Sequence, residues 1–167
     1  MTCDLNGRCV HERLDQVNAE PRSIYLRSVV EGVLAAVMMF ATVSLVALLF
    51  PQVLEGDDLE FGWGFTLIAV SLVPLTEEFL FRYLPSILYA RLPDFRYKLV
   101  SFALLTSAIF SYAHAFNEYY LVFPQFFLGL LLWRAMLRRG YLAAALLHGT
   151  YNATLLLPLA VASSLGF

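Results

Sequence analysis

The sequence predicts an all-α polytopic membrane protein, a helical bundle of about five spans, from its composition and from how its apolar and basic residues are distributed. The 167 residues are 60% hydrophobic and 14% charged, whereas soluble domains average about 45–50% apolar and about 25% charged residues. The apolar residues gather in five long runs, and the basic residues lie almost entirely between them. A soluble fold of this size could not bury so much apolar surface, so we expect the lipid bilayer to be its solvent.

The five runs have lengths that suit membrane-spanning helices. They cover approximately residues 28–50, 62–92, 99–115, 120–137 and 141–162. About 20 helical residues cross a hydrocarbon core of about 30 Å. The second run is too long for one upright span and contains Pro74, so we expect a broken helix near Pro74. Residues 1–21 are polar and predict an N-terminal tail, and 22–167 form one transmembrane domain.

The positions of the basic residues predict an orientation. Outside the runs or at their ends lie Arg8, Arg13, Arg22, Arg27, Arg91, Arg96, Lys98, Arg134, Arg138 and Arg139. With five spans, all of them fall on one side of the membrane, and the positive-inside rule assigns that side to the cytoplasm. We therefore expect a cytoplasmic N-terminus. The net charge of -2 gives no indication of a nucleic-acid partner.

A few strongly polar side chains interrupt the runs, and such groups are costly in lipid and usually functional. They are Glu77, Glu78, Arg82, His114, His148 and Asn152. Glu78 and Arg82 are four residues apart, which places them within reach of an ion pair. Glu77 is rotated by about 100° and has no such partner on its own helix, which leaves it available for proton transfer.

The histidines share helix faces with other notable residues. His148 and Asn152 are four residues apart and could offer two donors to an oxyanion, and Phe110 shares a face with His114. Each feature alone has a structural explanation, because an intramembrane histidine or asparagine often only bonds a neighbouring helix. Their occurrence together on three runs favours a functional site. For upright spans, however, Glu77 and His114 lie about 21–23 Å from the cytoplasmic ends and His148 only about 10 Å.

Three motifs resemble those of a known family. Residues 77–82 read E-E-x-x-x-R, residues 110–114 read F-x-x-x-H, and residues 148–152 read H-x-x-x-N. In this order on successive hydrophobic segments, the motifs resemble the CPBP family. That family includes type II CAAX prenyl endopeptidases and bacterial proteins linked to bacteriocin processing and immunity.

The resemblance implies a metal-free glutamic protease within the membrane. It implies that Glu77 is the general base that activates a water, and that His114 holds and polarises this water. It further implies that His148 and Asn152 stabilise the tetrahedral oxyanion. No cofactor is expected.

The remaining motif residues, Glu78 and Arg82, are expected to support the site. The resemblance also implies a prokaryotic plasma-membrane location and a substrate that is a membrane protein or a lipidated peptide.

Two alternatives remain open from the residues themselves. Glu77, His114 and His148 could bind zinc as a set of two histidines and one carboxylate, although no H-E-x-x-H motif is present. Alternatively, the protein could be a non-catalytic scaffold or immunity protein that binds a partner helix through the small residues of 143–145 and Gly149. The tail residues Cys3, Cys9 and His11 do not complete a four-ligand metal site.

Overall fold

The computed structural model describes residues 21–49, 63–93, 96–114 and 122–165, and these contain helices and short turns but no strand. The elements are α2 (Pro21–Leu49), α3 (Trp63–Glu78), the π-helix η3 (Phe79–Tyr83), α4 (Leu84–Arg91), α5 (Lys98–His114), α6 (Val122–Arg139) and α7 (Tyr141–Ser164). The predicted all-α bundle is therefore confirmed. Residues 1–20 of the predicted tail lie outside the described residues.

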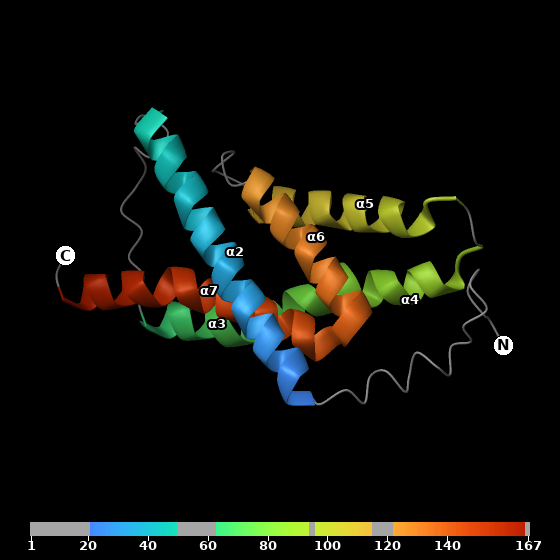
Figure 1. The fold of residues 1–167 in the computed structure, drawn as a ribbon, viewed down its shortest axis with the longest axis horizontal. Coiled ribbons are helices and arrows are strands. Elements are labelled where there is room, and N and C mark those ends of the chain that lie inside the picture. The colour runs from blue at the N-terminus through green and yellow to red at the C-terminus, as the bar shows by residue number, and fades with distance from the viewer. Residues whose placement is uncertain (1–20, 50–62, 94–95, 115–121, 166–167) are drawn as a thin grey trace.

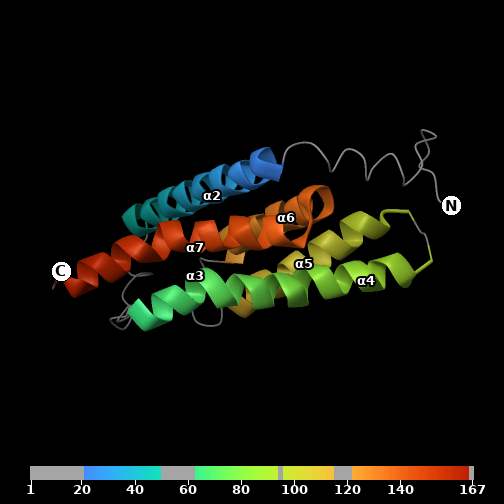
Figure 2. The same cartoon turned by 90° about the horizontal axis from the view of Figure 1, so that it is seen from below.

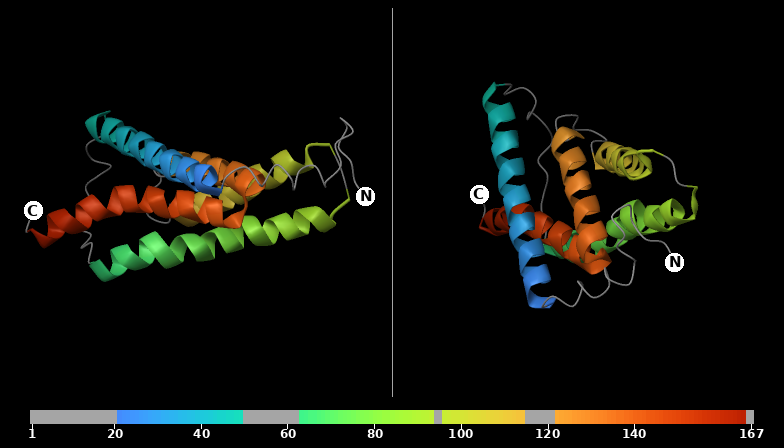
Figure 3. Two further views of the ribbon diagram at one scale, coloured as in Figure 1. Left: turned by 60° about the horizontal axis from the view of Figure 1, so that its bottom comes forward. Right: turned by 45° about the vertical axis from the view of Figure 1, so that its right-hand side comes forward.

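Helix α7 occupies the middle of the bundle. It lies between α2 and α3, which contact it from either side (Figure 1, Figure 2). Helix α5 packs against α6 and also contacts α4. Figure 3 shows that α3, η3 and α4 follow one another as a single long helix. This arrangement brings the middle of the long helix close to both α5 and α7.

Three helical stretches are long and apolar enough to cross a membrane. They are Ser23–Leu45, Trp63–Arg91 and Tyr141–Ser164. Large apolar side chains on these stretches, such as Met38 and Phe40, are strongly exposed, as expected for surfaces that face lipid. The protein is therefore an integral membrane protein. Helix α5 has 17 residues and α6 has 18 with three arginines, so the spans formed by α5 and α6 stay predictions.

The predicted break near Pro74 is wrong, because α3 continues through Pro74 to Glu78. The helix instead changes to π geometry five residues later, over Phe79–Tyr83. Pro85 provides a physical reason, since in a regular α-helix its ring would clash with the carbonyl of Phe81. A wider π turn just before Pro85 relieves this clash.

Helix α7 covers the part of α3 that Pro74 weakens. Pro74 has no N–H, so the carbonyl of Val70 loses its usual helical donor. Gly149 lies against this carbonyl, so closely that a Cβ there would be 2.8 Å from the Val70 oxygen. One turn of α7 further on, Asn152 donates from Nδ2 to the Ala69 carbonyl at 2.8 Å. Contacts from a neighbouring helix thus allow the proline inside α3.

The start of α7 is level with the middle of the long helix and not with its end. Tyr141 donates its hydroxyl to the Leu75 carbonyl at 2.7 Å, and its ring meets the Tyr83 ring edge-on at 5.8 Å. Figure 2 shows α4 continuing past the turn between α6 and α7. His148, in the second turn of α7, therefore comes level with Glu77. This removes the difference in depth that upright, equal spans would produce.

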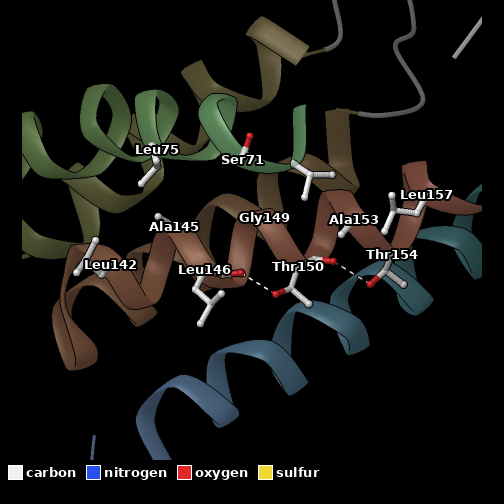
Figure 4. A pocket seen from close by; sticks show the side chains of 11 residues that line it. Ser71, Leu75, Leu142, Ala145, Leu146, Gly149, Thr150, Ala153, Thr154 and Leu157 are labelled. Atoms are coloured by element: carbon white, nitrogen blue, oxygen red, sulfur yellow. Dashed lines mark hydrogen bonds between the residues drawn. The ribbon is translucent and has the colours of Figure 1, made fainter. Parts of the chain in front are cut away.

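The small residues expected to receive a partner helix are buried inside the bundle. Ala143, Ala144, Ala145 and Gly149 all pack within the chain. Beside Ala145 and Gly149, an open cavity of about 530 Å³ follows the contact between α3 and α7 (Figure 4). Its hydroxyls, on Ser71, Thr150 and Thr154, all donate to carbonyls of their own helices. These hydroxyl donors are therefore already used within the helices, and the cavity presents mainly apolar groups.

Candidate active site

Five of the six predicted site residues meet at one place. Glu77 and Glu78 end α3, Arg82 lies in η3, His114 ends α5, and His148 lies near the start of α7. They are joined by side-chain contacts of 2.9–3.5 Å. The predicted convergence of three separate segments is therefore present in the structure.

The inner part of the site is a fully enclosed ion pair. Arg82 lies 3.2 Å from Glu78 Oε1, and both side chains are completely buried. The guanidinium also lies 4.1 Å from the centre of the Phe110 ring, a cation–π arrangement. Buried charges are tolerated only when paired, so each of these two groups requires the other. The predicted Glu78–Arg82 pair is thus formed.

The inner contacts fix which nitrogen of each imidazole carries a proton. His148 Nδ1 lies 2.9 Å from Glu78 Oε1, and a carboxylate paired with Arg82 accepts a hydrogen bond there. His114 Nδ1 lies 2.8 Å from the Phe110 carbonyl, which can only accept. Both Nδ1 atoms therefore donate, and both Nε2 atoms are left for other partners.

The two Nε2 atoms face the carboxylate of Glu77. His114 Nε2 lies 3.3 Å from Oε1, and His148 Nε2 lies 3.5 Å from Oε2. The Glu77 side chain is 20% exposed, whereas that of Glu78 is 0% exposed. Glu77 thus has partners after all, supplied by α5 and α7 instead of its own helix. It is also the accessible carboxylate of the two.

Several buried polar atoms at the site have no hydrogen-bond partner among the described residues. They are Oε2 of Glu77, Oε2 of Glu78, and Nε and the second terminal nitrogen of Arg82. Buried polar atoms in proteins are normally satisfied by protein groups or by water. The site is therefore suited to water molecules and to the polar groups of a substrate.

The family described as type II CAAX prenyl endopeptidase, Rce1-like, matches residues 59–154. This stretch covers more than half of the chain and contains all three motifs. The chain belongs to the Rce1-like family. Comparisons with curated proteins and with solved structures found no match. Membership in this family, together with the apolar helices, implies a CAAX-type protease embedded in the membrane.

Phe110 has a larger part in this Rce1-like site than its place at the start of a motif indicates. Its carbonyl accepts from His114, and its ring centre lies 4.3 Å from that of His114 and 5.7 Å from that of His148. With Arg82 over its face, it touches three of the polar groups. The four-residue spacing to His114 was the available signal, but nothing in the sequence indicated the contacts with Arg82 and His148.

Asn152 is the predicted residue that does not join the cluster. Its amide donates to the carbonyl of Ala69, which lies two turns before Glu77 on α3. A carboxamide nitrogen carries two N–H groups, and the bond to Ala69 occupies one of them. A role for Asn152 at an oxyanion stays a prediction.

No group of three or more His, Cys, Asp or Glu side chains within the described part of this family member is arranged to hold a metal ion. The Glu77 carboxylate instead lies 3.3 Å from His114 Nε2 and 3.5 Å from His148 Nε2, distances that suit hydrogen bonds or shared protons. The zinc alternative stays untested, and chelation of the purified protein would test it.

Proposed function

We propose that the protein is an intramembrane endopeptidase that cleaves a peptide bond of a membrane-associated protein or peptide with a water activated by Glu77. One observation carries the proposal. Two imidazoles, each held through its Nδ1, direct their Nε2 atoms at the two oxygens of one partly exposed carboxylate. A carboxylate in this position can act as a general base, and the imidazoles can orient what it acts on.

The first step is attack by water on the peptide carbonyl. A water held beside both Glu77 and His114 gives one proton to the carboxylate and directs its other hydrogen at His114 Nε2, which has a free lone pair in the neutral ring. The water oxygen then adds to the carbonyl carbon. The carbonyl π bond opens and leaves a tetrahedral oxyanion. Glu77 next passes its proton to the amide nitrogen as the carbon–nitrogen bond breaks.

The oxyanion needs donors, and His148 is well placed to supply one. Glu78, itself held by Arg82, accepts from Nδ1 of His148 and keeps Nε2 of the ring directed at Glu77. In the doubly protonated imidazolium form, this Nε2–H donates to the oxyanion. The second N–H of Asn152 completes the pair of donors. Such donors act strongly because the surroundings exclude bulk water.

The remaining parts of the proposal concern substrate and location. The family favours a membrane protein or a lipidated peptide as the substrate, and the lipid bilayer is the medium. We place the protein in a prokaryotic plasma membrane with its N-terminus in the cytoplasm. Support for this orientation comes from the distribution of Lys and Arg along the sequence.

A Glu77→Gln variant tests the chemistry. We expect turnover to fall by at least about 10²–10⁴-fold, with little change in stability, because Gln keeps the size of the side chain. The measurement compares membrane proteomes of cells that express either form and looks for a shortened product. Thr76→Ala is the matched control, since Thr76 bonds only carbonyls of its own helix.

The outcomes separate the alternatives. A shortened product that persists with Glu77→Gln would refute the assignment of the base. A cellular phenotype that persists without any cleavage would favour the non-catalytic partner-binding protein. Loss of activity with chelators, restored by added zinc, would favour the metalloprotease.

A further inference from the structure

A second polar cavity, which shares no residue with the Glu77 site, lies between α2 and α6. It has a volume of about 220 Å³. Its lining consists of Ser23, Ile24, Arg27, Glu31, Arg134, Arg138 and Arg139. Four guanidinium groups thus face one carboxylate, which gives the lining a formal charge of +3. So strong an excess of one sign favours a ligand of the opposite sign.

Two of the four arginines are held in place by the single acid. Arg27 Nε donates to Glu31 Oε1 at 3.0 Å, and Arg139 donates to Glu31 Oε2. Arg139 also donates to the Ser28 hydroxyl at 2.9 Å, and its side chain is largely buried. Glu31 therefore neutralises part of the charge and fixes the shape of one wall.

The other two arginines, Arg134 and Arg138, have no hydrogen-bond or ion-pair partner among the described residues. They are four residues apart, so they lie on the same face of α6. They stand near the C-terminal end of that helix, where the helix dipole favours cations. Two guanidinium groups that make no such contact within the described ranges match the oxygens of a phosphate group.

Exposed apolar side chains stand next in sequence to residues of the cavity lining. Leu26 and Val30 on α2 are 66% and 48% exposed, and Leu137 on α6 is 49% exposed. Ile24 reaches into the lining itself. A ligand at this place therefore meets cations at one end and lipid-facing hydrocarbon at the other. This combination fits an amphiphile better than a soluble anion.

We propose that the arginine cavity between α2 and α6 binds the phosphate of an anionic phospholipid. The lipid belongs to the leaflet in which α2 begins, which the sequence predicts to be cytoplasmic. Its acyl chains lie along the exposed apolar faces of α2 and α6, and its phosphate accepts from Arg134 and Arg138. The site is independent of the proteolytic reaction, so its test needs no substrate.

The first measurement is thermal unfolding of the purified full-length protein in a neutral detergent. Phosphatidylglycerol, phosphatidylcholine and inorganic phosphate are added in separate arms. Phosphatidylglycerol near saturation should raise the Tm by about 5 °C, and the other two should have little effect. An equal rise with inorganic phosphate would overturn the lipid assignment, and so would an equal rise with phosphatidylcholine.

The second measurement compares two double variants. Arg134→Gln/Arg138→Gln removes two cations that have no ion-pair partner in the described part of the chain, and it should lose the effect of phosphatidylglycerol. Arg91→Gln/Arg96→Gln removes the same charge from exposed positions outside the cavity and should keep the effect. Native mass spectrometry counts the retained lipids and gives the same comparison if the variants differ in basal Tm. Equal loss in both doubles would show a general surface charge effect and overturn the site.

Discussion

Glu77 and Glu78 are neighbours in the sequence but belong to regions of opposite character. The inner cluster, formed by Glu78, Arg82 and Phe110, is closed, and its opposite charges lie 3.2 Å apart without any exposure. The outer cluster, formed by Glu77, His114 and His148, is partly accessible at its carboxylate. One helix serves both regions, because consecutive side chains point about 100° apart.

The difference teaches how a membrane protein can keep a reactive carboxylate in lipid. The inner cluster contains the fully buried charges, and its Glu78 carboxylate orients His148. In the outer cluster, the two imidazoles that face Glu77 are already oriented by the hydrogen bonds of their Nδ1 atoms. Changes in the inner cluster should therefore act mainly on folding, and changes in the outer cluster should act mainly on turnover.

The largest effect on stability should follow from Glu78→Gln. This change leaves Arg82 buried without a counter-charge, which costs about 3–5 kcal/mol, whereas Glu77→Gln should cost far less. Chemical unfolding in mild detergent measures the difference. The double variant Glu78→Gln/Arg82→Met should recover part of the loss, because it removes both charges. Equal stability of Glu77→Gln and Glu78→Gln would contradict the division into two clusters.

In the proposed mechanism, Asn152 donates a hydrogen bond to the oxyanion next to the outer cluster. Asn152→Ala should lower kcat by about 10²-fold through the lost donor, while the lost bond to Ala69 should lower stability by about 1 kcal/mol. Kinetics on a cleaved reporter and thermal unfolding separate the two effects. Thr154→Ala is the control, since Thr154 donates only to its own helix. A rate that stays normal in folded Asn152→Ala would remove this residue from the chemistry.

The smallest expected effect on turnover concerns the contact that sets both clusters against α7. In Gly149→Ala, the new methyl would lie 2.8 Å from the Val70 carbonyl, so α3 must move away. We expect a loss of about 1–3 kcal/mol, with slower turnover because Glu77 moves relative to His148. Gly64→Ala is the matched control, because nothing lies within 4 Å of its added Cβ. Similar unfolding curves for the two variants would show that the close approach is unimportant.

The sequence predicted those parts of the site that depend on local spacing. The pair Glu78–Arg82 follows from a separation of four residues, and the same spacing joins Phe110 to His114. The meeting of α3, α5 and α7 is a long-range property, and its prediction rested on the three motifs together.

Other parts of the structure could not be predicted in this way. Asn152 bonds a main-chain carbonyl, and a carbonyl looks the same at every residue, so no pattern indicated Ala69 as its partner. The expected helix break near Pro74 was wrong because the prediction considered Pro74 without its neighbouring helix. Pro74 is compensated by α7, while Pro85, which follows η3, accounts for the π turn.

The way α7 holds α3 has a consequence for tolerance to change. Tyr141, Gly149 and Asn152 all meet main-chain oxygens of α3. The alignment of the two helices is thus encoded almost wholly on α7. Exchange of the Val70 or Leu75 side chains, which line the open cavity beside α7, for other apolar ones should leave it intact, whereas one residue inserted into α7 between Tyr141 and Gly149 would misplace every contact beyond it.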